Sequence, residues 1–149
     1  MYLLDTNHCS RILQGHISLK KKLSEIDNLL IATCTVVCGE LIFMAHKSQQ
    51  KDSNLLLIKE FIQNIKVFPI DEPTAYIYGE LKALLLKHFG PKEKTKRNGF
   101  KIEKLGLKEN DLWIAAIAKY NDLTIVSSDN DFKRMQEVAS LKLDQWWAP

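Results

Sequence analysis

Short apolar runs alternate with longer amphipathic ones along this chain, and the first short run stops abruptly at a carboxylate. Residues 2–4 are Tyr-Leu-Leu, and Asp5 follows them directly. An apolar run of this length is typical of a strand that is buried on both faces of a sheet. Asp5 then lies at the carboxyl end of its strand, which is the edge where ligands bind in open α/β sheets.

The same alternation continues to the end of the chain. We predict further strands at residues 29–34, 67–70, 123–126 and 141–143, with edge positions for the strand that contains Pro69 and for the last one. Helices are predicted at residues 7–14, 18–26, 36–47 (capped by Thr35), 51–65, 71–89, 110–120 and 131–138. Nearly continuous apolar strands that alternate with helices predict an α/β fold with a parallel sheet covered on both faces.

Length and composition restrict the class of protein. The 149 residues, 46% hydrophobic and 26% charged, fit a single globular domain spanning 1–149. No apolar run approaches the roughly 18 residues that cross a membrane, and Asp5 interrupts the N-terminus before a signal peptide could form, so we expect a cytoplasmic protein. The three cysteines and four histidines lack metal-binding spacings. We therefore expect reduced, mostly buried thiols and no histidine-based site.

Five acidic residues occupy unusual positions. Asp5, Asp129 and Asp131 follow strands, Asp111 begins a strongly apolar helix, and Glu40 lies inside a helix that is apolar all round. Taken singly, each Asp could be a helix cap, and Glu40 could pair with a buried Lys or Arg. Taken together, they place several like charges on one rim, which a divalent cation would stabilise. Oxygen ligands without His or Cys favour Mg²⁺, or Mn²⁺ as a substitute, over Zn²⁺.

Four motifs occur in order across the whole chain: LLDTN at residues 3–7, GEL at 39–41, NDLWIAA at 110–116 and SSDNDF at 127–132. With these motifs the chain resembles PIN-domain ribonucleases, closest to the VapC-type toxins of prokaryotic toxin–antitoxin pairs. The resemblance implies a three-layer fold with a five-stranded parallel sheet. It also implies endonucleolytic RNA cleavage with a metal-activated water, homodimerisation, and a cognate antitoxin that inserts a segment at or near the acidic pocket.

The resemblance also assigns roles to residues. It implies that the Mg²⁺ is bound, and catalysis performed, by Asp5, Glu40, Asp111 and Asp129, with Asp131 as a less regular further ligand. Thr6, Asn7 and Ser127 are expected to orient carboxylates or water.

A basic stretch departs from many compact relatives by its length. Between Lys87 and Lys108 lie eight basic and two acidic residues, so the remainder of the chain is mildly acidic although the net charge is +3. The stretch leads into the helix of Asp111, and we expect it to lie near the site and contact RNA phosphates. The expected contacts are Lys94, Lys96, Arg97 and Lys101. The alternative is a solvated or disordered loop.

Two other classes of protein stay open at this point. A haloacid-dehalogenase-type phosphatase also carries an Asp after its first strand, but it needs a second Asp where this chain has Asn7. A non-catalytic module that binds RNA or a protein partner could keep the acidic rim as folding support. Trp146 and Trp147, near the C-terminus, are expected to pack on the core or at an interface.

Overall fold

A five-stranded parallel sheet forms the centre of the computed structural model, which describes residues 1–147. The strands are β1 (Tyr2–Leu4), β2 (Ile31–Cys34), β3 (Lys66–Phe68), β4 (Thr124–Val126) and β5 (Lys142–Asp144). Their order is β3-β2-β1-β4-β5, so β3 and β5 are the edge strands, as predicted. Tyr2 of β1 lies opposite Ile31 on one side and Thr124 on the other.

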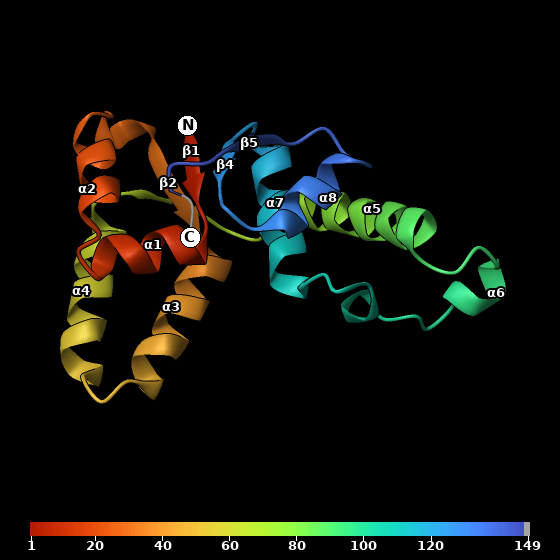
Figure 1. Ribbon diagram of the computed structural model, residues 1–149, viewed down its shortest axis with the longest axis horizontal. Coiled ribbons are helices and arrows are strands. Elements are labelled where there is room, and N and C mark those ends of the chain that lie inside the picture. Colours follow the sequence, from red (N-terminus) through yellow and green to blue (C-terminus); the bar gives the residue numbers. More distant parts are fainter. Residues whose placement is uncertain (148–149) are drawn as a thin grey trace.

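Helices cover both faces of this sheet, which confirms the predicted three-layer α/β fold. Figure 1 shows α1 to α4 on one side of β1 and α5, α7 and α8 on the other. The helices are α1 (Thr6–Leu13), α2 (Ile17–Ser24), α3 (Thr35–Lys47), α4 (Lys51–Gln63), α5 (Glu72–Phe89), α6 (Lys94–Arg97), α7 (Glu109–Tyr120) and α8 (Asn130–Gln136), with short 3₁₀ helices η1 (Asn28–Leu30) and η2 (Ile102–Leu105).

The core forms where the apolar strands meet the most apolar helix. Leu3 and Leu4 of β1 and Ile125 of β4 have no exposed surface, and α7 buries nearly every residue from Asp111 to Ala118. The predicted internal position of this helix is therefore confirmed. Because α7 is held on both sides, by the sheet and by α5, its first turn has a fixed position relative to the strand ends.

The strand order creates a switch point between β1 and β4. From β1 the chain adds β2 and then β3 on one side, whereas β4 and β5 lie on the other side. Connections therefore leave β1 and β4 in opposite directions, which opens a crevice at their carboxyl ends where α/β proteins bind ligands. Asp5 follows β1 directly, and its N–H donates to Val126 O, the last residue of β4, at 3.2 Å.

Two local predictions, about the start of β2 and about the cap of α3, are wrong. Residues 29 and 30 belong to η1, because pairing with β1 begins only at Ile31. Thr35 is the first residue of α3 and does not cap it; Cys34 takes that position and makes no side-chain capping bond.

The helix α3, although it is apolar all round, is not buried all round. Ile42, Phe43 and Met44 are 40, 63 and 45% exposed. Only the face with Val37, Leu41 and Ala45 is buried. An exposed apolar face of this kind marks an interaction surface rather than a core.

The basic stretch is an ordered insertion. It contains α6 and η2, and it is anchored by Ile102 and Leu107, which are 0 and 1% exposed. Nη1 of Arg97 donates to the carbonyls of Pro91 and Lys92, which closes the turn before α6. Figure 1 shows α6 at the outer end of this insertion, well away from β1 and β4.

The cysteines and the helices agree with the remaining expectations. Cys9 and Cys34 are buried, Cys38 is half-buried, and all three are free thiols. Burial raises the pKa of the Cys34 thiol to about 12, so it stays protonated. Among residues 1–147 no helix combines the length and the apolar character that crossing a membrane requires.

Candidate active site

Three carboxylates meet at the carboxyl edge of the sheet. Asp111 comes from the first turn of α7, Asp129 is the N-cap of α8, and Asp131 lies in the first turn of α8. Each can offer an oxygen so that the three oxygens lie within 4.8 Å of one another. Asp111 and Asp131 are 9 and 8% exposed, so this is a largely buried acidic cluster.

The acidic cluster perturbs its own ionisation. Burial, and then the nearby charges of Asp129 and Asp131, raise the pKa of Asp111 to about 7, against the lowering effect of Lys108. Burial and the charge of Asp129 also raise the pKa of Asp131. Oδ2 of Asp111 is buried and has no hydrogen-bond partner. An orphaned carboxylate oxygen between like charges fits a divalent ion that takes oxygen ligands.

Lys108 supplies the positive charge of the cluster. Its Nζ lies 2.8 Å from Oδ2 of Asp129 and 3.7 Å from Oδ2 of Asp111. Burial raises the pKa of Asp129, but hydrogen bonds from the Asp131 N–H and from this ammonium outweigh burial and leave that pKa lowered. The same hydrogen bond raises the pKa of Lys108.

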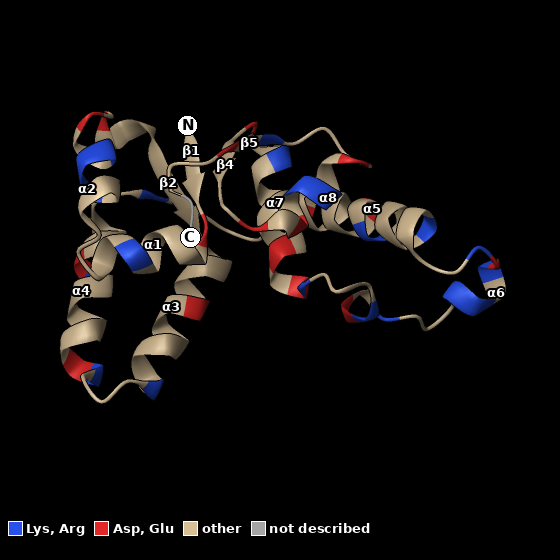
Figure 2. Ribbon diagram, in the orientation of Figure 1, with Lys and Arg blue, Asp and Glu red and all other residues tan. Residues whose placement is uncertain are grey.

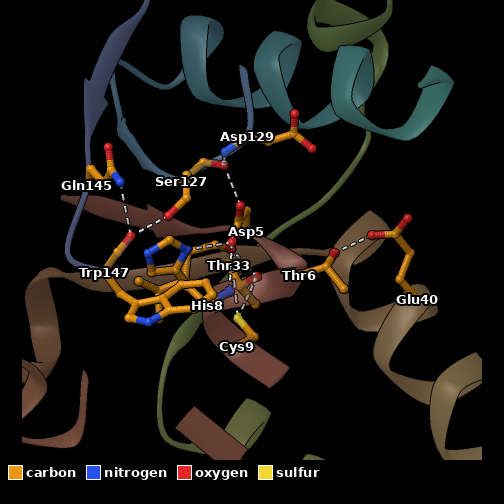
Figure 3. A network of polar contacts seen from close by, with 12 residues as sticks. Asp5, Thr6, His8, Cys9, Thr33, Glu40, Ser127, Asp129, Gln145 and Trp147 are labelled. Carbon is orange, nitrogen blue, oxygen red and sulfur yellow. Dashed lines mark hydrogen bonds and ion pairs between the residues drawn. The ribbon is translucent and has the colours of Figure 1, made fainter. Parts of the chain in front are cut away.

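Asp5 lies beside the cluster and is joined to it by hydrogen bonds (Figure 3). Its Oδ1 accepts from the backbone N–H of His8 at 2.7 Å and contacts Nδ1 of His8 at 2.8 Å. Its Oδ2 accepts from Oγ of Ser127, and that hydroxyl in turn accepts from the N–H of Asp129 at 3.0 Å. Ser127 thus connects Asp5 to Asp129, in the position that was predicted for an orienting hydroxyl.

Glu40 lies beside Thr6, the residue that follows Asp5 (Figure 3). Its carboxylate accepts hydrogen bonds from Oγ1 of Thr6 and, at 2.7 Å, from Nδ2 of Asn110. It forms no ion pair with a Lys or Arg among residues 1–147, so the alternative of a buried salt bridge is wrong. Asn7 is exposed and contributes no side-chain hydrogen bond in the described part of the chain.

Capping and site formation turn out to be compatible. Asp5 caps α1 and Asp129 caps α8 through their Oδ1 atoms, whereas the second oxygen of each accepts from a residue of the site, Ser127 for Asp5 and Lys108 for Asp129. Asp111 is not a cap, because Lys108 is the N-cap of α7. Asp111 therefore has no capping role, and it is the carboxylate with the unpartnered oxygen.

Three residues of this site were not predicted. No role was predicted for His8, which is fully buried against Asp5, one helical turn further along α1. Asn110 and Lys108 precede Asp111 in the sequence, where neither residue type signals a ligand. Figure 2 shows that the basic residues of α6, Lys94, Lys96 and Arg97, lie far from the start of α7. In the ion pairs described, Lys108 is the residue of the basic stretch that reaches the acidic cluster.

The PIN domain family matches residues 2–138, and the chain belongs to that family. A tRNA(fMet)-specific endonuclease VapC from Shigella flexneri is 25% identical over 145 residues, 97% of each chain. Ribonuclease VapC2 from Haemophilus influenzae is 25% identical over 147 residues, again 97% of each.

Solved structures give the same result. VapBC2 from Rickettsia felis, bound to a promoter DNA fragment, superposes with a TM-score of 0.74 at 25% identity, covering 97% of this chain and 98% of that one. DNA-bound VapBC from Salmonella typhimurium has the same fold, with a TM-score of 0.78 at 20% identity, covering 98% of both chains. The comparisons confirm the resemblance to VapC-type PIN ribonucleases and the enzyme class, and they exclude the haloacid-dehalogenase alternative.

Proposed function

We propose that this protein is a Mg²⁺-dependent endoribonuclease of the cytoplasm and the toxin of a toxin–antitoxin pair. The observation that supports this proposal most directly is the cluster of Asp111, Asp129 and Asp131, whose oxygens lie within 4.8 Å of one another. Moreover, Oδ2 of Asp111 has no hydrogen-bond partner. Carboxylates gathered at a switch point are suited to holding Mg²⁺ over a phosphodiester.

The residues divide into ligands and positioning groups. Asp111, Asp129 and Asp131 would hold Mg²⁺, with Asp5 beside them and Glu40 acting directly or through water. When bound, the ion lowers the pKa of water and offsets charge on the phosphoryl oxygens. Ser127 and His8 fix the orientation of Asp5, whereas Thr6 and Asn110 fix Glu40. His8 is fully buried, so it positions a carboxylate and does not touch RNA.

The proposed substrate is RNA, cut by in-line attack of water to leave a 5′-phosphate. The basic insertion supports this, since Lys94, Lys96, Arg97 and Lys101 lie on its exposed or half-exposed surface, outside the acidic cluster. Contacts at that distance position an RNA backbone and read no sequence. A product with a 2′,3′-cyclic phosphate would contradict the scheme.

An antitoxin and a second copy of the chain are the proposed protein partners. The similarity to VapBC complexes supports the antitoxin. A groove of about 490 Å³ between α1, α3 and α4 has a mixed lining, in which Leu13, Met44 and Leu57 are apolar and Gln14 and Asn54 are polar. It lies on the helix that carries Glu40, so a segment bound there would reach the site. Exposed Phe43 and Tyr76, 63 and 74%, offer further apolar surface to a partner.

The test is cleavage of a pool of transfer RNAs and other structured RNAs with Mg²⁺, by wild type and by Asp129→Asn, with EDTA as a control. We expect Mg²⁺-dependent cuts with 5′-phosphate ends that the variant makes at least about 100-fold more slowly. Asp122→Asn is the matched control, because Asp122 is an exposed aspartate that pairs with Lys142 away from the cluster. Equal cutting by wild type and Asp129→Asn would refute the assignment.

A further inference from the structure

The ammonium of Lys108 lies where a cation shared by Asp111 and Asp129 would lie. Its Nζ is 2.8 Å from Oδ2 of Asp129 and 3.7 Å from Oδ2 of Asp111. The second of these oxygens has no hydrogen-bond partner of its own. One ammonium therefore serves two of the three carboxylates that gather within 4.8 Å.

The backbone of Lys108 is fixed, whereas its ammonium is free to leave. Leu107 is buried, and Gly106 adopts a left-handed conformation (φ 72°) that a side chain would strain, so the chain enters α7 in one path. Lys108 itself is the N-cap of α7. Its side chain is nevertheless 66% exposed, and only the tip contacts the carboxylates. A long, solvated side chain on a rigid base can swing away at little cost.

The ammonium of Lys108 and a divalent ion would compete for these oxygens. Mg²⁺ takes carboxylate oxygens at about 2.1 Å and demands a regular shell around them. An ammonium that stays in hydrogen-bond range of the same two carboxylates would stand within the first or second shell of the ion and repel it. Binding the metal must therefore break the ion pairs of Lys108.

We propose that Lys108 is an exchangeable internal counterion, which holds Asp111 and Asp129 together in the metal-free protein and is displaced when the divalent ion binds. This inference rests on the proposed metal centre. It gives Lys108 a role distinct from that of the lysines of α6, which lie too far away to compete. Lys108 weakens metal binding by the free energy of its own ion pairs, and it protects the metal-free cluster from mutual repulsion.

The test is direct metal binding without RNA. Free Mn²⁺ is measured by electron paramagnetic resonance during titration of wild type, Lys108→Met, Lys108→Arg and Lys119→Met. Lys119 lies at the far end of the same helix, about 16 Å along its axis, which exceeds the Debye length of about 8 Å at physiological salt. It therefore controls for the loss of one positive charge.

Lys108→Met should bind Mn²⁺ about fivefold more tightly than wild type, the range expected for losing a partly exposed ion pair. Lys108→Arg and Lys119→Met should stay within about twofold. In wild type, the Nζ resonance of Lys108, identified by its loss in Lys108→Arg, should shift on adding Mg²⁺, because the ammonium leaves its carboxylate partners. The Mg²⁺ titration is made on the wild type, and Lys108→Arg serves only to assign the resonance.

Equal or weaker binding by Lys108→Met, or an Nζ resonance indifferent to Mg²⁺, would overturn the counterion role while leaving the metal centre intact. Failure of wild type and every Lys108 variant to bind Mn²⁺ would overturn the metal centre and the inference together. If Lys119→Met bound Mn²⁺ more tightly to the same extent as Lys108→Met, the loss of one positive charge anywhere would explain the effect. That result would also overturn the counterion role.

Discussion

His8 holds Asp5 from two directions: its backbone N–H and its Nδ1 both meet Oδ1 of that carboxylate, at 2.7 and 2.8 Å. A neutral ring that donates from Nδ1 leaves Nε2 as an acceptor, and Nε2 is buried without a partner. The edge of Trp147 packs near the ring, at 6.2 Å between centroids. The imidazole is therefore fixed by one polar contact and by packing.

Replacing His8 separates these two contributions. His8→Asn keeps a donor near the position of Nδ1, whereas His8→Leu keeps volume and removes the donor. We expect His8→Leu to lose about 1–2 kcal/mol of unfolding free energy and to cleave RNA more slowly, because Asp5 loses its orienting partner. His8→Asn should retain more of the activity than His8→Leu. Urea denaturation and cleavage rates measure both effects; equal activity in the two variants would contradict the positioning role.

The raised pKa of Asp111 makes the metal-free protein sensitive to pH. Its folded pKa is about 7 against an ordinary value of 3.8, so between these values the folded state holds more protons than the unfolded state. Stability of the metal-free protein should therefore fall as pH rises from about 5 to about 7 and then level off. Thermal unfolding in EDTA measures this, with Asp111→Asn as the control that should lose the slope. A slope that persists in that variant would assign the effect to another group.

Asn110 should influence catalysis without supporting the fold. It is exposed, and its Nδ2 donates to Oε1 of Glu40 at 2.7 Å. We expect Asn110→Ala to reduce cleavage about tenfold with little change in stability, as for other partners of site carboxylates. Asn121→Ala is the matched control, since Asn121 ends the same helix and its side chain donates to the backbone carbonyl of Ile117, away from Glu40. A comparable loss of activity in the control would mean that α7 itself, and not Glu40, has been disturbed.

The basic insertion should contribute affinity for RNA and no chemistry. We expect a triple Gln variant at Lys94, Lys96 and Lys101 to bind RNA more weakly. The slope of log K against log salt should fall by about 0.7 for each phosphate that the insertion no longer neutralises. Arg97 is left intact because it closes the turn before α6. Binding is measured in the Asp129→Asn background, which keeps RNA uncut. The same change at Lys20, Lys21 and Lys22 of α2 is the control, and an equal loss there would exclude a specific role for the insertion.

The sequence predicted the sheet and the identity of the acidic residues because both depend on local patterns. A strand that is buried on both faces of a sheet has a continuous apolar sequence, as at residues 2–4. The polar residue that ends such a run can therefore be identified from the sequence. The hydrogen bonds that connect the carboxylates could not be predicted from local patterns. Thr6 meets Glu40 across 34 positions, and Asn110 meets it across 70, so only the packing of α3 and α7 against the sheet brings them together.

The exposed face of α3 and the contact of His8 with Asp5 could not be predicted from the sequence, for physical reasons. A helix that is apolar all round has the same pattern whether it is buried or faces a partner, so the exposure of Phe43 could not be read from its neighbours. A single histidine carries no spacing signal. Only the helical start at Thr6, which places residue 8 back over Asp5, reveals that His8 belongs to the site.

The strand order also determines when the acidic cluster of this nuclease can assemble during synthesis of the chain. Asp5 and Glu40 leave the ribosome early, but β1 lacks its second neighbour, and the cluster lacks two of its three aspartates, until residues 124–131 have been made. A partly translated chain therefore carries no complete centre.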